Sequence, residues 1–175
     1  GENVAELGNY ARGLRQVVSD PAAAWRELAG LAGALATTPD LKRGLIDAAA
    51  RPEPARGKRL ASLLNPCSRP VARLVELLLV DQELDAVPKL ADAFARELAK
   101  EGYARVHLET PTPLNGPAER GILKALKIDP RRALVTYEDN ERLLGGVRAT
   151  VDGRVIDASL GGRLDRVAEA VGGIA

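Results

Sequence analysis

The sequence is poor in the residues that build metal centres, disulfide scaffolds and aromatic binding surfaces. Among its 175 residues are one Cys, one His, no Met and only five aromatic side chains. A single cysteine excludes an intramolecular disulfide, and a single histidine excludes a metal site made from several histidines. The net charge of +1 disfavours a protein whose main task is to grip nucleic acid or an acidic membrane surface. The longest apolar run, Leu28 to Ala36, falls well short of the roughly 20 residues that cross a membrane.

Alanine and leucine dominate the residues that are present, and both favour helices. Together they fill 55 positions, close to a third of the chain. The β-branched residues Val, Ile and Thr are distributed unevenly, with ten in residues 1–104 and twelve in the much shorter stretch 105–157. Because β-branched side chains favour strands, the sequence predicts an α+β protein. We expect a helical domain over residues 1–103 and a small α/β domain over residues 104–175.

Apolar spacing and proline positions predict six helices in the first domain. The first has an apolar face at 3-4-3-4 spacing from Val4 to Val18. Later helices open at Asp20-Pro21, at Thr38-Pro39 and at Ser68, where a capping side chain or an early proline starts a helix. Residues 51–58 hold two prolines and a glycine and predict a break before a short fourth helix, and the sixth helix should end near residue 102. Such helices bury their apolar stripes by packing as a six-helix bundle. The glycines inside the first two helices indicate close approach of neighbouring helices; these are Gly8, Gly13, Gly30 and Gly33.

The second domain reads as strand, helix, strand, β-hairpin and terminal helix. Alternating residues predict strands over 104–109, 133–137, 147–151 and 154–157, and residues 117–126 predict a helix. Gly145 and Gly146 would let the chain turn into the hairpin, and Asp152-Gly153 is the pair typical of its type I′ turn. The terminal helix carries an apolar stripe of Leu160, Leu164, Val167 and Val171.

The residues alone reveal no catalytic group, cofactor site or metal site. His107 alternates with charged neighbours, which favours a solvated strand residue over a catalytic base. Cys67 lies between predicted helices and is best interpreted as a free structural thiol. Four basic residues over Arg51–Arg59 are best explained as a solvated loop, although an unrelated helical module that binds RNA or protein through this loop is the alternative interpretation. The pattern favours an interaction or structural protein over an enzyme.

Several segments resemble a known family. The strings are ERLLGG at Glu141–Gly146, VIDASLGGRL at Val155–Leu164, the Tyr10-Ala11 pair, and the stretch from Leu84 to Phe94. They resemble the delta subunit of F-type ATP synthases, whose mitochondrial counterpart is the oligomycin-sensitivity-conferring protein. The sequence departs from the family pattern at Glu83, Ala158 and residues 110–112.

The resemblance implies a non-catalytic stator adapter in a hetero-oligomeric complex. Such an adapter joins N-terminal segments of the α subunits to the b subunits of the peripheral stalk, so that rotor torque is resisted. It implies a peripheral position on the cytoplasmic face of a bacterial inner membrane, or its organellar equivalent, without membrane insertion, nucleic acid or cofactor. The family uses its first and fifth helices for the α segment, which here correspond to Tyr10, Gly13, Leu14, Val17, Leu74, Leu78 and Leu79. The terminal helix, with Leu160, Leu164 and Val167, is then assigned to the stalk.

Overall fold

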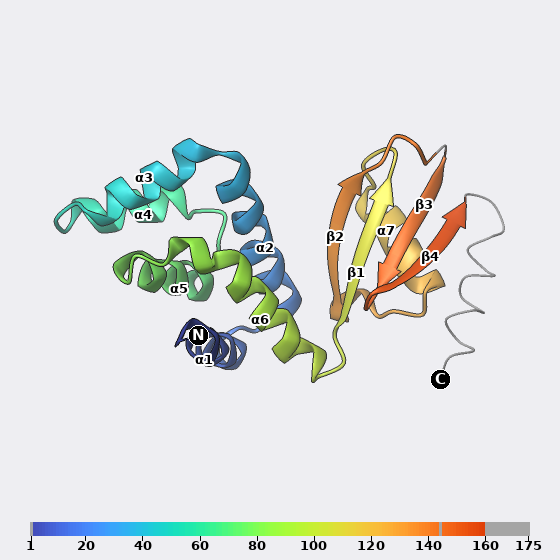
Figure 1. Cartoon of the computed structure of the whole chain (residues 1–175), viewed down its shortest axis with the longest axis horizontal. Coiled ribbons are helices and arrows are strands. Elements are labelled where there is room, and N and C mark those ends of the chain that lie inside the picture. The colour runs from blue at the N-terminus through green and yellow to red at the C-terminus, as the bar shows by residue number, and fades with distance from the viewer. Residues whose placement is uncertain (1, 144, 160–175) are drawn as a thin grey trace. The chain divides into compact units, whose positions relative to one another are not determined.

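The chain forms two compact units, Gly1–Lys100 and Glu101–Ala175. The computed structural model describes residues 2–143 and 145–159. Within those residues it contains seven α-helices and one four-stranded sheet (Figure 1), so the predicted α+β class is confirmed. None of the described helices combines the length and the apolarity that a membrane span requires.

The first unit is helical throughout. Its helices are α1 (Glu2–Val17), α2 (Pro21–Thr37), α3 (Pro39–Ala49), α4 (Ala55–Leu63), α5 (Arg69–Val80) and α6 (Val87–Ala99). Helix α6 packs against α1 and α2, α3 packs against α4, and α5 contacts α1, α2 and α3. The largest fully buried side chains that line this interior are Leu28, Leu45, Leu78, Leu90, Phe94 and Leu98. Helix α5 therefore lies where three other helices meet.

Local chemistry sets most of the helix starts. Asp20 caps α2 by accepting a hydrogen bond from the Ala23 amide at 3.1 Å, and Pro21 occupies the first turn, as predicted. Ser68 precedes α5 but does not cap it through its own side chain. Instead, the Ser68 amide and hydroxyl both donate to the Glu27 carboxylate, at 2.9 Å and 2.7 Å. A side chain from α2 thus takes over the anchoring of the α5 start.

Three expectations for this unit need correction. The predicted break over residues 51–58 is too long, because α4 already begins at Ala55. Helix α6 ends at Ala99, slightly before the predicted end near Gly102. The predicted close approach at the helix glycines is wrong, since a Cβ added at Gly13, Gly30 or Gly33 would meet no atom within 4 Å.

The second unit is a mixed sheet with a helix on one face. Its elements are β1 (Ala104–Thr110), α7 (Gly116–Ala125), β2 (Ala133–Asp139), β3 (Gly146–Val151) and β4 (Arg154–Ser159), and the strand order is β2-β1-β3-β4. Strand β1 is parallel to β2 and antiparallel to β3. Ile122, Leu123 and Leu126 form a separate core with apolar side chains of β1, β2 and β3.

The predicted hairpin joins β3 to β4. Asp152 and Gly153 both have positive φ angles, 47° and 85°, as a type I′ turn requires. Gly145 has a φ of 69° immediately before β3, and Gly146 is the first residue of that strand. The glycines thus stand where the sequence predicted turns, and side chains at Gly145 and Gly153 would be strained.

Candidate interaction surface on the first unit

The residues expected to hold an α-subunit segment separate into interior and surface positions. Four leucines lie in the interior with at most 7% of their surface exposed: Leu14, Leu74, Leu78 and Leu79. Tyr10 is half-buried and Gly13 is exposed, whereas 65% of Val17 is accessible. These last three positions follow one another along α1 at spacings of three and four residues, so they share one side of the helix. A partner can reach that side without opening the fold.

Helix α5 contributes exposed apolar residues that the sequence did not single out. Leu77 is 50% exposed and Val80 is 73% exposed. The end of this helix reads LVELLLV, so apolar residues occupy almost every position and periodicity cannot separate inward from outward ones. Only the packing of α5 against its neighbours shows which residues lie outside.

A hydrogen bond ties the two helices together beside these apolar residues. The Tyr10 hydroxyl donates to Asp81, directly after α5, over 3.3 Å. Burial raises the pKa of Tyr10 above its usual value, and the nearby charges of Asp81 and Glu6 raise it further. A tyrosine is protonated at neutral pH even without this shift, so the phenol can act as the donor. We call the exposed set Tyr10, Gly13, Val17, Leu77 and Val80 the α1–α5 surface.

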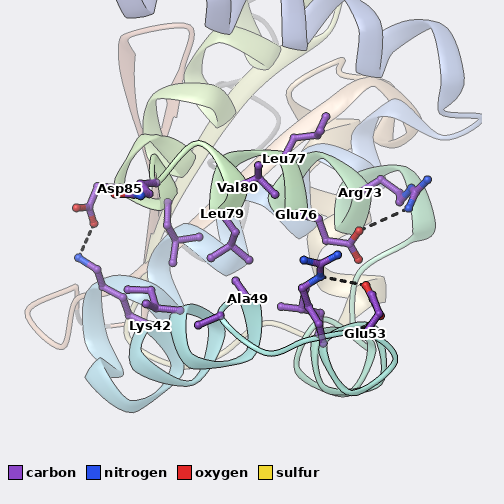
Figure 2. Close-up of a pocket in the computed structure, with 16 residues that line it drawn as sticks. Lys42, Ala49, Glu53, Arg73, Glu76, Leu77, Leu79, Val80 and Asp85 are labelled. Atoms are coloured by element: carbon purple, nitrogen blue, oxygen red, sulfur yellow. Dashed lines mark hydrogen bonds and ion pairs between the residues drawn. The ribbon is translucent and has the colours of Figure 1, made fainter.

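A groove opens between α5 and helices α3 and α4 (Figure 2), and it shares Leu77 and Val80 with the α1–α5 surface. Its volume is about 1100 Å³, and its apolar lining includes Ile46, Ala49, Leu77, Leu79 and Val80. Three ion pairs lie along it: Lys42–Asp85 at 2.7 Å, Arg56–Glu53 at 3.0 Å and Arg73–Glu76 at 3.7 Å. Because each of these cations faces an acid, the groove offers apolar contact without a strong charge preference. The pairing of Arg56 with Glu53 also lowers the net positive charge of the stretch Arg51–Arg59, through which the alternative interpretation has the chain bind RNA.

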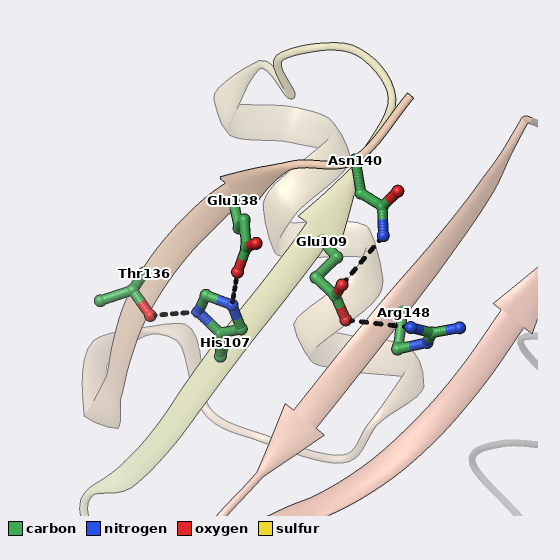
Figure 3. A network of polar contacts seen from close by, with 6 residues as sticks. All are labelled: His107, Glu109, Thr136, Glu138, Asn140 and Arg148. Carbon is green, nitrogen blue, oxygen red and sulfur yellow. Dashed lines mark hydrogen bonds and ion pairs between the residues drawn. The ribbon is translucent and has the colours of Figure 1, made fainter. Parts of the chain in front are cut away.

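The sheet face opposite α7 carries a polar network (Figure 3). His107 lies 2.8 Å from the Thr136 hydroxyl through Nδ1 and 3.1 Å from the Glu138 carboxylate through Nε2. Next to this group, Glu109 accepts a hydrogen bond from Asn140 at 3.0 Å and pairs with Arg148 at 3.6 Å. His107 was expected to be a simply solvated residue, and this expectation is corrected, because both ring nitrogens have protein partners.

Among the residues that the structure describes, the remaining reactive groups do not form a catalytic constellation. Cys67 is half-buried and unbonded to another cysteine, and its burial, together with the charge of Glu27, raises the pKa of the thiol. A raised pKa reduces the thiolate fraction and hence the reactivity. Within residues 2–143 and 145–159, no three His, Cys, Asp or Glu side chains gather as a metal site would require.

The residues assigned to the stalk cannot be placed. Leu160, Leu164 and Val167 lie outside the described residues, as does the predicted terminal helix to which they belong.

Comparison with known proteins settles the family. The model of the family described as ATP synthase delta (OSCP) subunit matches residues 8–171, nearly the whole chain. The chain belongs to this family. The delta (OSCP) family is a structural subunit of ATP synthase and not a catalytic enzyme.

Curated relatives align with this chain along most of its length. The chain is 31% identical over 160 residues to ATP synthase subunit delta of Cupriavidus pinatubonensis and 29% identical over 161 residues to that of Cupriavidus metallidurans. Each alignment covers 89% of both proteins. ATP synthase subunit delta of Burkholderia ambifaria is 29% identical over 174 residues, which cover 92% of this chain and 95% of the relative. The resemblance of the motifs to the delta family is therefore confirmed.

Proposed function

We propose that this chain is the stator adapter of an F-type ATP synthase, joining the catalytic head to the peripheral stalk. Helices α1–α6, acting as a six-helix bundle, hold the N-terminal segment of an α subunit. The second unit, with residues 160–175, receives the ends of the b subunits. The adapter works by rigidity and durable contact, and sits peripherally at the cytoplasmic face of the bacterial membrane that carries the complex.

The α1–α5 surface carries the first part of this proposal. Three apolar side chains lie exposed on these two adjacent helices: Val17, Leu77 and Val80. An amphipathic helix laid along such a surface would bury them, and burial of apolar area is the main driving force of helix-in-groove recognition. Gly13 lies on the same side of α1 with open space around it, so a partner backbone can come close there. The interior leucines Leu14, Leu74, Leu78 and Leu79 support the surface from beneath.

Binding of an α-subunit N-terminal peptide tests the proposal. We expect a one-to-one complex in calorimetry with the full chain. Leu77→Asp and Val80→Asp should each weaken it at least tenfold, about 1.4 kcal/mol, because each places a charge where an apolar contact forms.

Two matched variants locate the site. Val155→Asp changes a valine of the second unit that is 63% exposed and should leave peptide affinity unchanged. Ile46→Asp, in the groove but on α3, should also leave it unchanged if the peptide lies on the α1 side of α5. Loss of binding with Ile46→Asp as well as with Leu77→Asp and Val80→Asp would move the segment into the groove, which all three residues line. Absence of binding to the unmodified chain at tens of micromolar would refute the proposed function.

A further inference from the structure

The short stretch of chain between the two units is held at both of its ends. At the first unit, Lys100 follows α6, and its ammonium group pairs with the Glu97 carboxylate at 2.8 Å. Its amide also donates to the Glu97 carbonyl at 3.2 Å. At the second unit, residues 101–103 lead into β1, and the side chain of Arg132 lies against all three of them.

Local structure fixes the place of Arg132. It ends the short 3-10 helix η2 (Pro130–Arg132), in which its amide donates to the Asp129 carbonyl at 2.9 Å. Strand β2 begins directly after η2, and its first residue is paired with Ala104, the first residue of β1. Tyr103 and Arg132 precede this pair, so their side chains leave neighbouring parallel strands at the same end of the sheet.

The Arg132 guanidinium makes two contacts of different kinds with the connecting stretch. Its Nη1 donates a hydrogen bond to the Glu101 carbonyl, and its Cζ lies 5.5 Å from the centre of the Tyr103 ring. A planar guanidinium can stack on an aromatic ring and still donate from its edge, whereas the compact ammonium of a lysine lacks both the flat face and the fork of donors. One side chain therefore holds two points of the stretch.

Gly102 lies between these two points and has the backbone conformation that the contact requires. Its φ of 87° falls in a region that residues with a Cβ rarely adopt. A Cβ at this position would lie 3.3 Å from Nη1 of Arg132, which is closer than ordinary packing. Glycine thus allows both the turn of the backbone and the close approach of Arg132.

We propose that Arg132 is a latch that fixes residues 101–103 to the second unit and thereby sets the length of free chain between the units. With the latch closed, the joint is the single peptide bond between Lys100 and Glu101. With the latch open, residues 101–103 are released ahead of β1 and add about 10 Å of reach when extended. The latch needs no partner, so it stands independently of the proposed stator function.

The latch can open without unfolding the sheet. Both Glu101 and Arg132 are exposed, so their hydrogen bond competes with water and stabilises only modestly. Strand β1, in contrast, is paired with β2 on one side and β3 on the other. Breaking the contacts of Arg132 therefore frees the residues before β1 while the ladder of β1 stays intact.

Limited proteolysis of the full chain tests the latch. A protease cleaves only where the chain opens locally, so lysine-specific cleavage after Lys100 reports how freely residues 101–103 leave the second unit. Arg132→Ala should raise the initial rate of this cleavage at least fivefold. Arg131→Ala is the matched control, because it removes the same charge from a neighbouring side chain that is 92% exposed, and it should leave the rate unchanged. Neither substitution alters the cleaved sequence.

The same digest separates the latch from a general loss of stability. Lys124 lies in α7, so cleavage after it reports unfolding of the second unit as a whole. Faster cleavage after Lys100 with no change after Lys124 supports the latch. Equal increases at both sites, or no increase after Lys100, would overturn it.

Nitrogen-15 relaxation gives a second readout that does not depend on a protease. In the unmodified chain, the amides of residues 101–103 should have order parameters of about 0.85, as in rigid backbone, and in Arg132→Ala these should fall below about 0.6. Arg132→Lys should resemble Arg132→Ala, because it keeps the charge and loses the planar fork. Low order parameters in the unmodified chain, or full order in Arg132→Ala, would contradict the latch.

Discussion

Glycine occupies exposed positions inside α1 and α2, where it lowers the stability of each helix. Gly13, Gly30 and Gly33 have open space where a Cβ would stand. Replacing any of them with alanine restricts the unfolded chain and meets no obstacle in the folded one. We expect each substitution to raise the free energy of unfolding by about 0.5–1 kcal/mol, measured by urea denaturation.

Replacement of glycine with alanine at a turn should lower the free energy of unfolding instead of raising it. Gly153 also has open space around it, but its φ of 85° is strained for any residue with a Cβ. Gly153→Ala should therefore destabilise the second unit by about 1 kcal/mol or more. A loss of stability at Gly30 comparable to that at Gly153 would show that α2 is more closely covered at this point than the structure indicates.

At the scale of elements, the carboxylate of Glu27 couples α2 to the start of α5. It accepts hydrogen bonds from both the amide and the hydroxyl of Ser68. Hydrogen bonds to a charged group stabilise more than neutral ones, so Glu27→Ala should cost about 1–3 kcal/mol in urea denaturation. Ser68→Ala removes only the hydroxyl and should cost less.

A double-mutant cycle isolates this coupling. Glu27→Ala and Ser68→Ala together should destabilise by less than the sum of the single variants, because they share one interaction. Arg43→Ala is the control, since its ion pair with Asp40 lies within α3 and both partners are largely exposed. That substitution should change the free energy of unfolding by no more than about 0.5 kcal/mol. Strict additivity of the Glu27 and Ser68 effects would contradict the anchoring.

Sequence patterns predicted single elements well wherever the signal was local. Proline and Asp20 marked the start of α2, and Asp152-Gly153 marked the hairpin, because these residues fix backbone angles by themselves. The Glu27–Ser68 contact lies 41 residues apart in sequence and had no local signature. The outward side of α5 was hidden for a related reason: Leu77 and Leu78 are chemically identical, yet one is half-exposed and the other fully buried.

At the scale of the whole molecule, the two units have separate hydrophobic cores and natural reporters of each. Trp25, the single tryptophan, is 5% exposed in the first unit, and His107, the single histidine, lies in the second. Leu123→Ala should destabilise the second unit by about 2–5 kcal/mol. In urea the unfolding midpoint followed by the His107 ring signals in NMR should fall, while the midpoint followed by Trp25 fluorescence should not change.

Leu78→Ala is the converse test, because it changes the core of the first unit. Leu78 is fully buried in the first unit, so the loss should appear in Trp25 fluorescence and leave the His107 signals unaffected. Parallel shifts of both reporters with either variant would mean that the two units unfold as one cooperative structure.

Family membership and general architecture could be inferred from the sequence, but the surface that would meet a partner could not. The motifs at Glu141–Gly146 and Val155–Leu164 are contiguous in sequence, so they can be read without knowledge of the fold. An interaction surface is assembled from distant elements, here Val17 on α1 and Val80 on α5, and depends on which side of each helix the core leaves free. The packing of the helices determines which side stays exposed, and the local sequence pattern does not show it.

The position of β1 has a mechanical consequence. It is the first element of the second unit, and it is paired on both sides, with seven residues of β2 and four of β3. Tension that enters through residues 101–103 and is directed along the axis of β1 acts across the direction of its ladder hydrogen bonds. The bonds are then loaded together in shear and cannot be unzipped one at a time. A strand at the sheet edge, pulled from its end at a right angle, would open bond by bond at a much lower force.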